Sequence, residues 1–231
     1  MFRHIPTFGE AQYNTLVTGP AKDRPIQLTQ ADLAHIGALV ARAQKGDREA
    51  FDSLVELYAP QVYNLALRVT GSREEAEDCV QDAFLRAFCA LRSFRGEAAF
   101  STWLYRVALN VATDAARKRA RNPISASELA SDDADEPPPD LERVADKAPT
   151  GDHGPEVVFL AKQRRLTVLK AIRQLPEHQR AVVILYDLQG LSYEEIAQIL
   201  RTRVGTVKSR LNRARLALRD LLAADLELLH G

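Results

Sequence analysis

Residues 191–215, with the sequence LSYEEIAQILRTRVGTVKSRLNRAR, predict two helices separated by a tight turn. Ser192 and Glu195 have the spacing of a capping box, so a short helix is expected to start at Tyr193. Thr202 can cap the second helix. The apolar residues of that helix recur at three- and four-residue steps and form one core-facing stripe: Val204, Val207, Leu211, Ala214 and Leu218.

The opposite side of the second helix carries hydroxyls and cations, namely Thr206, Lys208, Ser209, Arg210 and Arg213. Such side chains suit the major groove of DNA, where Arg reads guanine edges and Ser or Thr fits against phosphate or base. The alternative interpretation is a solvated basic face in an ordinary helical bundle, which is favoured for a basic amphipathic helix taken alone. The capped helix directly before it favours a DNA-binding helix-turn-helix.

The distribution of charge along the 231-residue chain also indicates a nucleic-acid partner. The composition, 46% hydrophobic and 27% charged, is ordinary for a soluble globular protein, and the formal net charge is +0. Residues 1–121 have a net charge of +2, residues 122–156 of −8, residues 157–220 of +8 and residues 221–231 of −2. The basic C-terminal part is therefore expected to bind nucleic acid.

Several classes of protein are disfavoured. No signal peptide and no bilayer-spanning apolar run can be identified, which predicts a cytoplasmic protein without membrane insertion. Cys79 and Cys89 fall about 15 Å apart on one expected helix, beyond the roughly 7 Å limit for a disulfide, so free thiols are expected. No residues have the spacing of a zinc site, and no cofactor is expected. Without a phosphate loop, or a nucleophile and base in motif spacing, the sequence argues against an enzyme.

The first half of the chain predicts a helical domain over residues 31–121 that follows a flexible tail over residues 1–30. Pro60 is expected to end one of its helices. A second capping box, Ser72 with Glu75, begins the next helix. The far side of that helix is a candidate protein-docking surface formed by Asp78, Gln81, Asp82 and Leu85.

A loop at residues 94–97 precedes a long helix that runs from Ser101 towards Arg119. A second face of this helix interleaves cations, an amide and one large aromatic: Trp103, Arg106, Asn110, Thr113 and Arg117. This face fits nucleic acid, because rings stack on bases and cations follow phosphates. The alternative is that Trp103 is a half-buried core residue, and the two roles are compatible.

Residues 122–156 change in composition, with three consecutive prolines and a cluster of carboxylates, and they predict a flexible, disordered acidic linker. Apolar periodicity returns in a second domain over residues 157–225, which ends in the helix-turn-helix. The expected fold class is all-α, with two small helical domains joined by the acidic linker.

Three stretches together resemble the extracytoplasmic-function sigma factors of bacterial RNA polymerase, group 4 of the sigma-70 superfamily. They are residues 77–84, 94–110 and 191–210, and they occur in the family's order at about the family's distances. The resemblance implies sigma region 2 in the first domain, sigma region 4 in the second, and an alternative sigma factor that promotes transcription initiation. The helix pair taken alone would also fit a free-standing helix-turn-helix transcriptional regulator, which is the alternative function.

The resemblance also implies partners and contact residues. The surface with Asp78 would dock on the clamp helices of core RNA polymerase, the polymerase flap would be a second contact, and an anti-sigma factor would hold the free protein inactive. The implied contacts to the minus-ten promoter element, including a base flipped into the loop at residues 91–100, are Phe94, Arg95, Trp103, Arg106, Asn110 and Arg117. The implied contacts to the minus-thirty-five element are Arg203, Thr206, Lys208, Ser209, Arg210, Asn212 and Arg213.

Arg201 departs from the family pattern, because it occupies the turn between the two helices where the family often has Gly. A non-Gly residue there costs about 1 kcal/mol if the turn requires positive φ.

Overall fold

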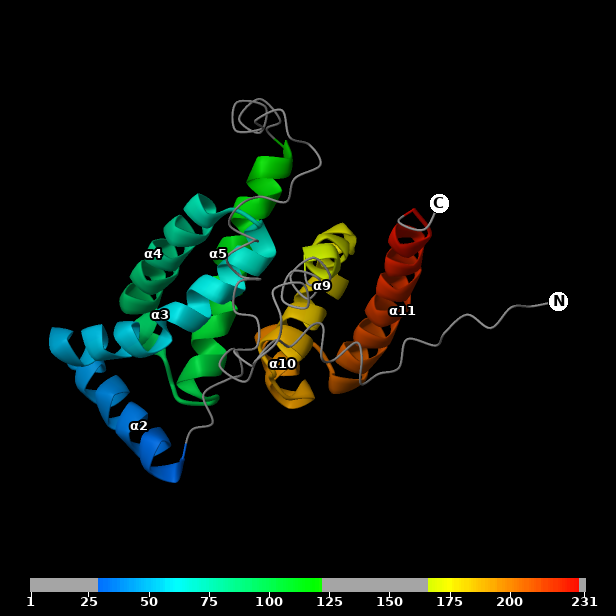
Figure 1. Cartoon of the computed structure of the whole chain (residues 1–231). Coiled ribbons are helices and arrows are strands. Elements are labelled where there is room, and N and C mark those ends of the chain that lie inside the picture. Colours follow the sequence, from blue (N-terminus) through cyan, green and yellow to red (C-terminus); the bar gives the residue numbers. More distant parts are fainter. Residues whose placement is uncertain (1–28, 122–165, 229–231) are drawn as a thin grey trace, which may run out of the picture.

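The computed structural model describes residues 29–121 and 166–228, and the regular structure within these residues is helical (Figure 1). The all-α fold class is therefore confirmed. None of the described helices is long and apolar enough to span a bilayer. The linker predicted over residues 122–156 and nearly all of the predicted N-terminal tail lie outside the described residues.

The N-terminal domain contains α2 (Gln30–Gln44), α3 (Arg48–Thr70), α4 (Arg73–Ala90) and α5 (Phe100–Arg121). Helices α3, α4 and α5 pack against one another, and α2 packs mainly on α3. Local signals define the helix ends. Thr29 and Asp32 form a reciprocal capping box at the start of α2, and the Asp47 side chain accepts the Ala50 N–H at the start of α3.

The prediction that Pro60 ends a helix is wrong, because Pro60 lies inside the continuous 23-residue helix α3. Tyr58 and Val62, on either side of Pro60, are 2% and 0% exposed, so both turns are anchored in the core. The proline removes one backbone hydrogen bond, and burial on both sides of it offsets that loss. Gly71 then ends the helix with φ +72°, a left-handed conformation that favours glycine.

The capping box expected at the start of α4 is only half formed. The Ser72 hydroxyl accepts the Glu75 N–H at 3.4 Å, as predicted. The Glu75 carboxylate, however, lies 3.7 Å from the guanidinium of Arg119 on α5. A contact between helices thus engages the side chain that local spacing had assigned to the helix end.

The C-terminal domain contains a helical segment at residues 166–174, α9 (Glu177–Val183), a π-helical turn η3 (Ile184–Leu188), α10 (Tyr193–Ile199) and α11 (Val204–Leu228). Helix α11 packs against α9 and α10. The expected core stripe of α11 is confirmed at Val207, Leu211, Ala214 and Leu218, which are all buried, and Val204 is partly buried.

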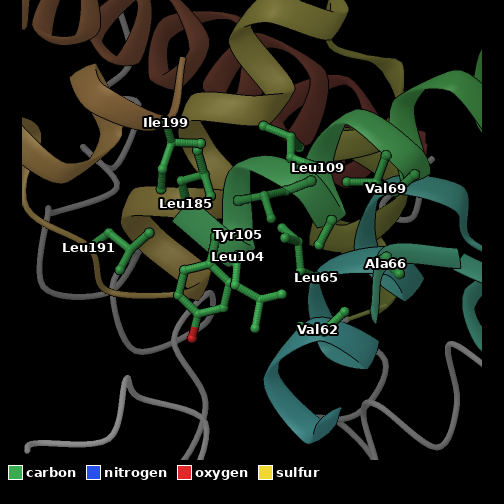
Figure 2. Close-up of a cluster of buried hydrophobic side chains, with 14 of the residues drawn as sticks. Val62, Leu65, Ala66, Val69, Leu104, Tyr105, Leu109, Leu185, Leu191 and Ile199 are labelled. Atoms are coloured by element: carbon green, nitrogen blue, oxygen red, sulfur yellow. The ribbon is translucent and has the colours of Figure 1, made fainter. Parts of the chain in front are cut away.

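The two domains pack against each other, which the sequence analysis did not anticipate. Helix α10 contacts α5, and η3 contacts α3. Figure 2 shows the shared cluster of buried side chains: Val62, Leu65, Ala66 and Val69 of α3, Leu104, Tyr105 and Leu109 of α5, and Leu185, Leu191 and Ile199 of the C-terminal domain. The hydrophobic core is therefore continuous from one domain to the other.

Candidate nucleic-acid interface

The helix pair begins with the predicted capping box. The Ser192 hydroxyl accepts the Glu195 N–H at 3.2 Å, and the Glu195 carboxylate accepts the Ser192 N–H at 2.8 Å. At the other end of α10, the Thr202 N–H donates to the Ala197 carbonyl at 2.9 Å and the Arg201 N–H to the Gln198 carbonyl at 3.4 Å. These two bonds form a Schellman motif, which requires a left-handed residue after the helix.

Arg201 is that left-handed residue, with φ +48°. Among the described residues, no other residue except glycines has a positive φ. The turn therefore has the geometry that favours glycine, as the family pattern indicated. A side chain in this conformation costs about 1 kcal/mol, and the buried residues of α10 on the other side of the turn offset this cost.

The residues implied to contact the minus-thirty-five element lie on the outer side of α11 or directly before it. Val207, Leu211 and Ala214 face the core, and the implied contact residues alternate with them along the helix. Arg203, Lys208, Ser209, Asn212 and Arg213 are exposed, and Thr206 and Arg210 are partly exposed. The structure thus presents all seven side chains to solvent, as a face that could enter a groove of DNA.

A cluster of alternating aromatic and charged side chains holds α11 against the rest of the domain. The guanidinium of Arg215 lies 2.8 Å from the buried carboxylate of Asp187 and 5.5 Å from the Tyr186 ring centroid. Tyr186 stacks on Tyr193 with ring centroids 4.7 Å apart, and the Lys208 ammonium lies 5.3 Å from the Tyr193 ring centroid. This aromatic–cation cluster links η3, α10 and α11, and it fixes the orientation of the outer face of α11.

The sequence analysis did not single out Asp187 or Arg215. The hydrogen bond with Tyr193 raises the pKa of the Tyr186 hydroxyl, and burial raises it further. The spacing of Asp187 and Arg215, 28 residues apart, contains no signal of their pairing. Only the fold brings η3 beside α11.

The loop between α4 and α5 and the first turn of α5 form a pocket of about 330 Å³. A 3₁₀ turn, η2 (Leu91–Ser93), begins the loop, and the Gln44 side-chain amide holds it by donating to the carbonyls of Leu91 at 3.1 Å and Phe94 at 2.7 Å. The pocket is lined by Ser93, Phe94, Arg95, Glu97, Ala98, Thr102, Trp103, Arg106 and Gln198. It therefore combines aromatic rings with cations, as a site for an unstacked base requires.

Trp103 is partly buried, as one of the two roles that the sequence left open requires, and its place in the pocket is compatible with the other. Its ring is partly buried, with centroids 5.2 Å from that of Phe94 and 5.7 Å from that of Phe100. It also lines the pocket. Packing on Phe94 and Phe100 fixes the ring in place, so a base that entered the pocket would meet a preorganised aromatic surface.

The structure brings together only part of the implied minus-ten set. Phe94, Arg95, Trp103 and Arg106 share the pocket. Asn110 and Arg117 lie further along α5, and both are exposed. Arg117 donates two hydrogen bonds to the Glu177 carboxylate of α9, at 2.8 and 2.7 Å, so its guanidinium is engaged by the other domain.

The outer face of α4 has the predicted composition. Asp78, Gln81 and Asp82 are exposed, and Leu85 is 63% exposed. Phe88, which the sequence analysis missed, is 44% exposed on the same helix, although its position three residues after Leu85 was a usable signal. The face is therefore acidic at its N-terminal end and apolar towards its C-terminal end.

The cysteines are free, as predicted: Cys79 is buried and Cys89 is exposed. Burial, together with the carboxylates of Glu75, Asp82 and Asp78, raises the pKa of the Cys79 thiol to about 11. Within residues 29–121 and 166–228, no group of three His, Cys, Asp or Glu side chains is arranged to hold a metal ion.

Comparisons with known proteins identify the family. The model of sigma-70 region 2 matches residues 54–122, and the model of sigma-70 region 4 matches residues 165–218. The chain is 42% identical over 182 residues to the ECF RNA polymerase sigma-E factor of Escherichia coli K12, covering 78% of this chain and 90% of the relative. This chain belongs to the extracytoplasmic-function (ECF) sigma factors. The sigma factor is also 40% identical over 188 residues to the RNA polymerase sigma-H factor of Pseudomonas aeruginosa PAO1, with coverage of 78% and 90%.

Two solved structures share the fold of this sigma factor. CnrH, in complex with the cytosolic domain of CnrY, gives a TM-score of 0.57 at 26% identity and covers 81% of this chain and 97% of its own. The sigma factor RpoE of Bartonella quintana, in complex with the anti-sigma factor NepR, gives a TM-score of 0.54 at 27% identity. The match covers 76% of this chain and 98% of RpoE. The family assignment favours a sigma factor over the free-standing regulator.

Proposed function

We propose that this ECF sigma factor docks on core RNA polymerase through α4 and recognises the two promoter elements with separate domains. Residues 31–121 would bind and melt the minus-ten element, and residues 157–225 would read the minus-thirty-five element. The observation that carries the proposal is the pocket of about 330 Å³, in which Phe94 and Trp103 provide aromatic surface beside Arg95 and Arg106. The outer face of α11 supplies the second contact.

The proposed mechanism is physical, because the protein stabilises an open form of the promoter. Unstacking a base step costs a few kcal/mol. Stacking of an extruded base on aromatic side chains contributes about 1–3 kcal/mol per base, and cations beside the pocket neutralise phosphate charge. The pocket therefore suits the capture of one flipped base, which offsets the cost of melting.

The sigma factor itself has no enzymatic role in this proposal, since RNA synthesis is the chemistry of the polymerase. It acts in the cytoplasm, where its partners are the clamp helices and flap of core polymerase together with promoter DNA. An anti-sigma factor is a further partner. This inference is supported by the likeness to RpoE, whose solved structure is a complex with an anti-sigma factor.

Run-off transcription with core polymerase and a library of promoter templates tests the function directly. The expected result is initiation at a subset of templates that core polymerase alone does not use. A free-standing regulator would instead bind duplex operators tightly by itself and add no transcription to core polymerase. Absence of transcription above core on every template would contradict the proposal.

Asp82→Arg is expected to weaken binding to core polymerase by about tenfold, because it places a cation in an acidic docking face. Asp82 is exposed, and its carboxylate lies 4.0 Å from the guanidinium of Arg86, which is also exposed. The fold should therefore tolerate the change. Asp52→Arg, at an exposed position on α3, is the control with the same change in charge. Affinity for fluorescently labelled core polymerase is the measurement, and equal effects of the two variants would exclude a specific role for Asp82.

Arg213→Ala is expected to weaken recognition of the minus-thirty-five element by roughly tenfold, since one Arg contact to a guanine edge contributes about 1–3 kcal/mol. Arg213 is exposed on the outer face of α11. Arg219→Ala, which removes an exposed cation further along the same helix, is the matched control. Holoenzyme binding to a promoter selected from the library is measured. If Arg213→Ala bound as the control does, the proposed reading face would be misplaced.

A further inference from the structure

We propose that Gln44, the last residue of α2, is a positioning residue for promoter melting, because its side chain sets the shape of the base pocket through the loop between α4 and α5. The inference rests on the proposed capture of an extruded base in that pocket. It adds that α2 takes part in minus-ten recognition, although it precedes the residues 54–122 matched by the region 2 model and carries none of the implied contacts.

The Gln44 amide spans the turn at which the loop begins. Its nitrogen donates to the Leu91 carbonyl at 3.1 Å and to the Phe94 carbonyl at 2.7 Å, across 47 and 50 residues of sequence. A glutamine amide has two N–H donors, so both are used. The Leu91 carbonyl also accepts the Phe94 N–H at 3.0 Å, which closes the turn η2. Gln44 thus joins the first residue of η2, and the residue that follows η2, to α2.

Burial alone does not fix this loop. Leu91 and Phe100, at its two ends, are 2% and 6% exposed. Most residues between them are exposed, namely Arg92, Ser93, Arg95, Gly96, Glu97 and Ala99. The hydrogen bonds from Gln44 therefore restrain a segment that the core holds mainly at its ends.

The corner between α2 and α3 holds Gln44 itself in place. The Asp47 carboxylate accepts the Ala50 N–H at 3.1 Å and the Arg42 guanidinium N–H at 2.8 Å, so one side chain caps α3 and binds α2. The Asp47 N–H also donates to the Arg42 carbonyl at 3.2 Å. Gly46 turns the chain with φ +97°, a conformation that favours glycine. The backbone of Gln44 is therefore fixed relative to α3.

The loop that Gln44 holds forms one wall of the pocket. Ser93, Phe94 and Arg95 are consecutive in the chain, and all three line the pocket. The Phe94 ring centroid lies 5.2 Å from that of Trp103 and 6.0 Å from that of Phe100. Because Gln44 binds the Phe94 carbonyl, it fixes the backbone from which this ring projects. Gln44 therefore acts through the loop and not as part of the pocket lining.

Without this restraint, an extruded base would have to order the loop as it enters the pocket. Ordering a loop on binding costs free energy that a preorganised site does not lose. A loosely held pocket would therefore gain less affinity from the base, although its rings and cations are unchanged. The expected signature is a reduced sensitivity to removal of that base, and not only weaker binding of DNA.

Gln44→Met tests the inference, because methionine is a similarly long, good helix former that has no N–H donor in its side chain. Gln30→Met, at an exposed position on the same helix, is the matched control. Each holoenzyme is titrated with a labelled non-template single strand that carries the minus-ten element of a promoter from the run-off library. Abasic sites replace its bases one at a time, and the position with the largest loss in the parent identifies the extruded base.

At that position the parent and Gln30→Met are expected to lose roughly tenfold in affinity, since one stacked base contributes about this much. Gln44→Met is expected to lose only about threefold or less, because the two hydrogen bonds that preorganise the pocket are missing. Each holoenzyme is compared with itself, so a smaller folded fraction of a variant cancels. An equal loss in Gln44→Met and the parent would overturn the inference and leave base capture intact. A parent that is insensitive at every position would overturn base capture, and the inference with it.

Fluorescence of the free chain provides a second measurement that uses neither polymerase nor DNA. Trp103 is the single tryptophan of the chain, and it is partly buried beside Phe94. Gln44→Met is expected to raise acrylamide quenching of Trp103 by about twofold, because the loop beside the ring opens more often. Gln30→Met should leave the quenching at the parent value. Unchanged quenching in Gln44→Met would overturn the inference independently of the run-off test.

Discussion

Asp187→Ala is expected to lower the free energy of unfolding of the C-terminal domain by about 2–3 kcal/mol. The Asp187 side chain is 2% exposed and lies 2.8 Å from the Arg215 guanidinium, which is 26% exposed. Removal of one partner of a buried ion pair typically costs about 3–5 kcal/mol, and the partial exposure of Arg215 reduces that value. Urea denaturation followed by circular dichroism measures the change.

Helix α11, which carries Arg215, also supplies a matched control for this prediction. Arg219 and Asp220 form an ion pair of the same length, 2.8 Å, but their side chains are 64% and 68% exposed. Asp220→Ala should change the unfolding free energy by less than about 1 kcal/mol. The double replacement Asp187→Leu with Arg215→Met should recover most of the lost stability, because it leaves no buried charge unpaired. A loss no larger in Asp187→Ala than in Asp220→Ala would contradict the assigned role.

Loss of the Asp187–Arg215 pair should also weaken promoter recognition, because the aromatic–cation cluster orients the outer face of α11. Arg215 contacts Tyr186, which stacks on Tyr193, and Tyr193 lies below the Lys208 ammonium. Lys208 is one of the implied DNA contacts, so the cluster joins a buried carboxylate to the face that we propose binds DNA. A misplacement of this face by even a small amount would spoil contacts that require defined hydrogen-bond geometry.

The features predictable from the sequence are those that depend on residues close together in the chain. The capping box of Ser192 and Glu195 and the periodicity of Val207, Leu211 and Ala214 defined the helix pair, and the structure contains both. The positive φ of Arg201, at a position where the family often has Gly, is likewise a property of the turn itself. Caps and periodicity report on hydrogen bonds and burial within one or two turns, which neighbouring residues determine.

Predictions from the sequence fail where residues distant in the chain determine the local structure. The helix continues through Pro60 because the turns on both sides are buried in the core. The Glu75 carboxylate lies near Arg119 of another helix and not at the cap where spacing had placed it. The π-helical turn η3, which positions Asp187, left no signal in the apolar pattern. In each case a tertiary contact outweighs a local preference, which amounts to about 3 kcal/mol for a proline in a helix interior.

The candidate site likewise contains features that neighbouring residues determine, which the sequence predicts, and features that distant residues determine, which it does not. Exposure of Asp78, Asp82 and Leu85 on α4 followed from helical periodicity alone. Helical spacing could not place Gln198 beside the pocket that contains Trp103, because these residues belong to different domains. The engagement of Arg117 by Glu177 has the same cause.

Trp103→Ala is expected to reduce transcription from fully duplex promoters by roughly 100-fold. The ring lines the base-sized pocket and packs on Phe94 and Phe100, so its removal deletes the stacking surface and loosens the loop that holds the other pocket residues. Loss of one base-stacking contact alone accounts for about 1–3 kcal/mol, or roughly 5- to 150-fold. Trp103→Tyr, which keeps a ring, should retain most of the activity.

A template with a pre-melted minus-ten region separates melting from binding in this experiment. If Trp103 acts by stabilising an extruded base, the defect of Trp103→Ala should shrink to about tenfold or less on the open template, because the cost of unstacking has already been met. Trp103 is also partly buried, so the thermal stability of the variant must be measured beside its activity. Equal defects on duplex and pre-melted templates, with reduced binding to core polymerase, would instead assign the ring a role in holding the N-terminal domain together.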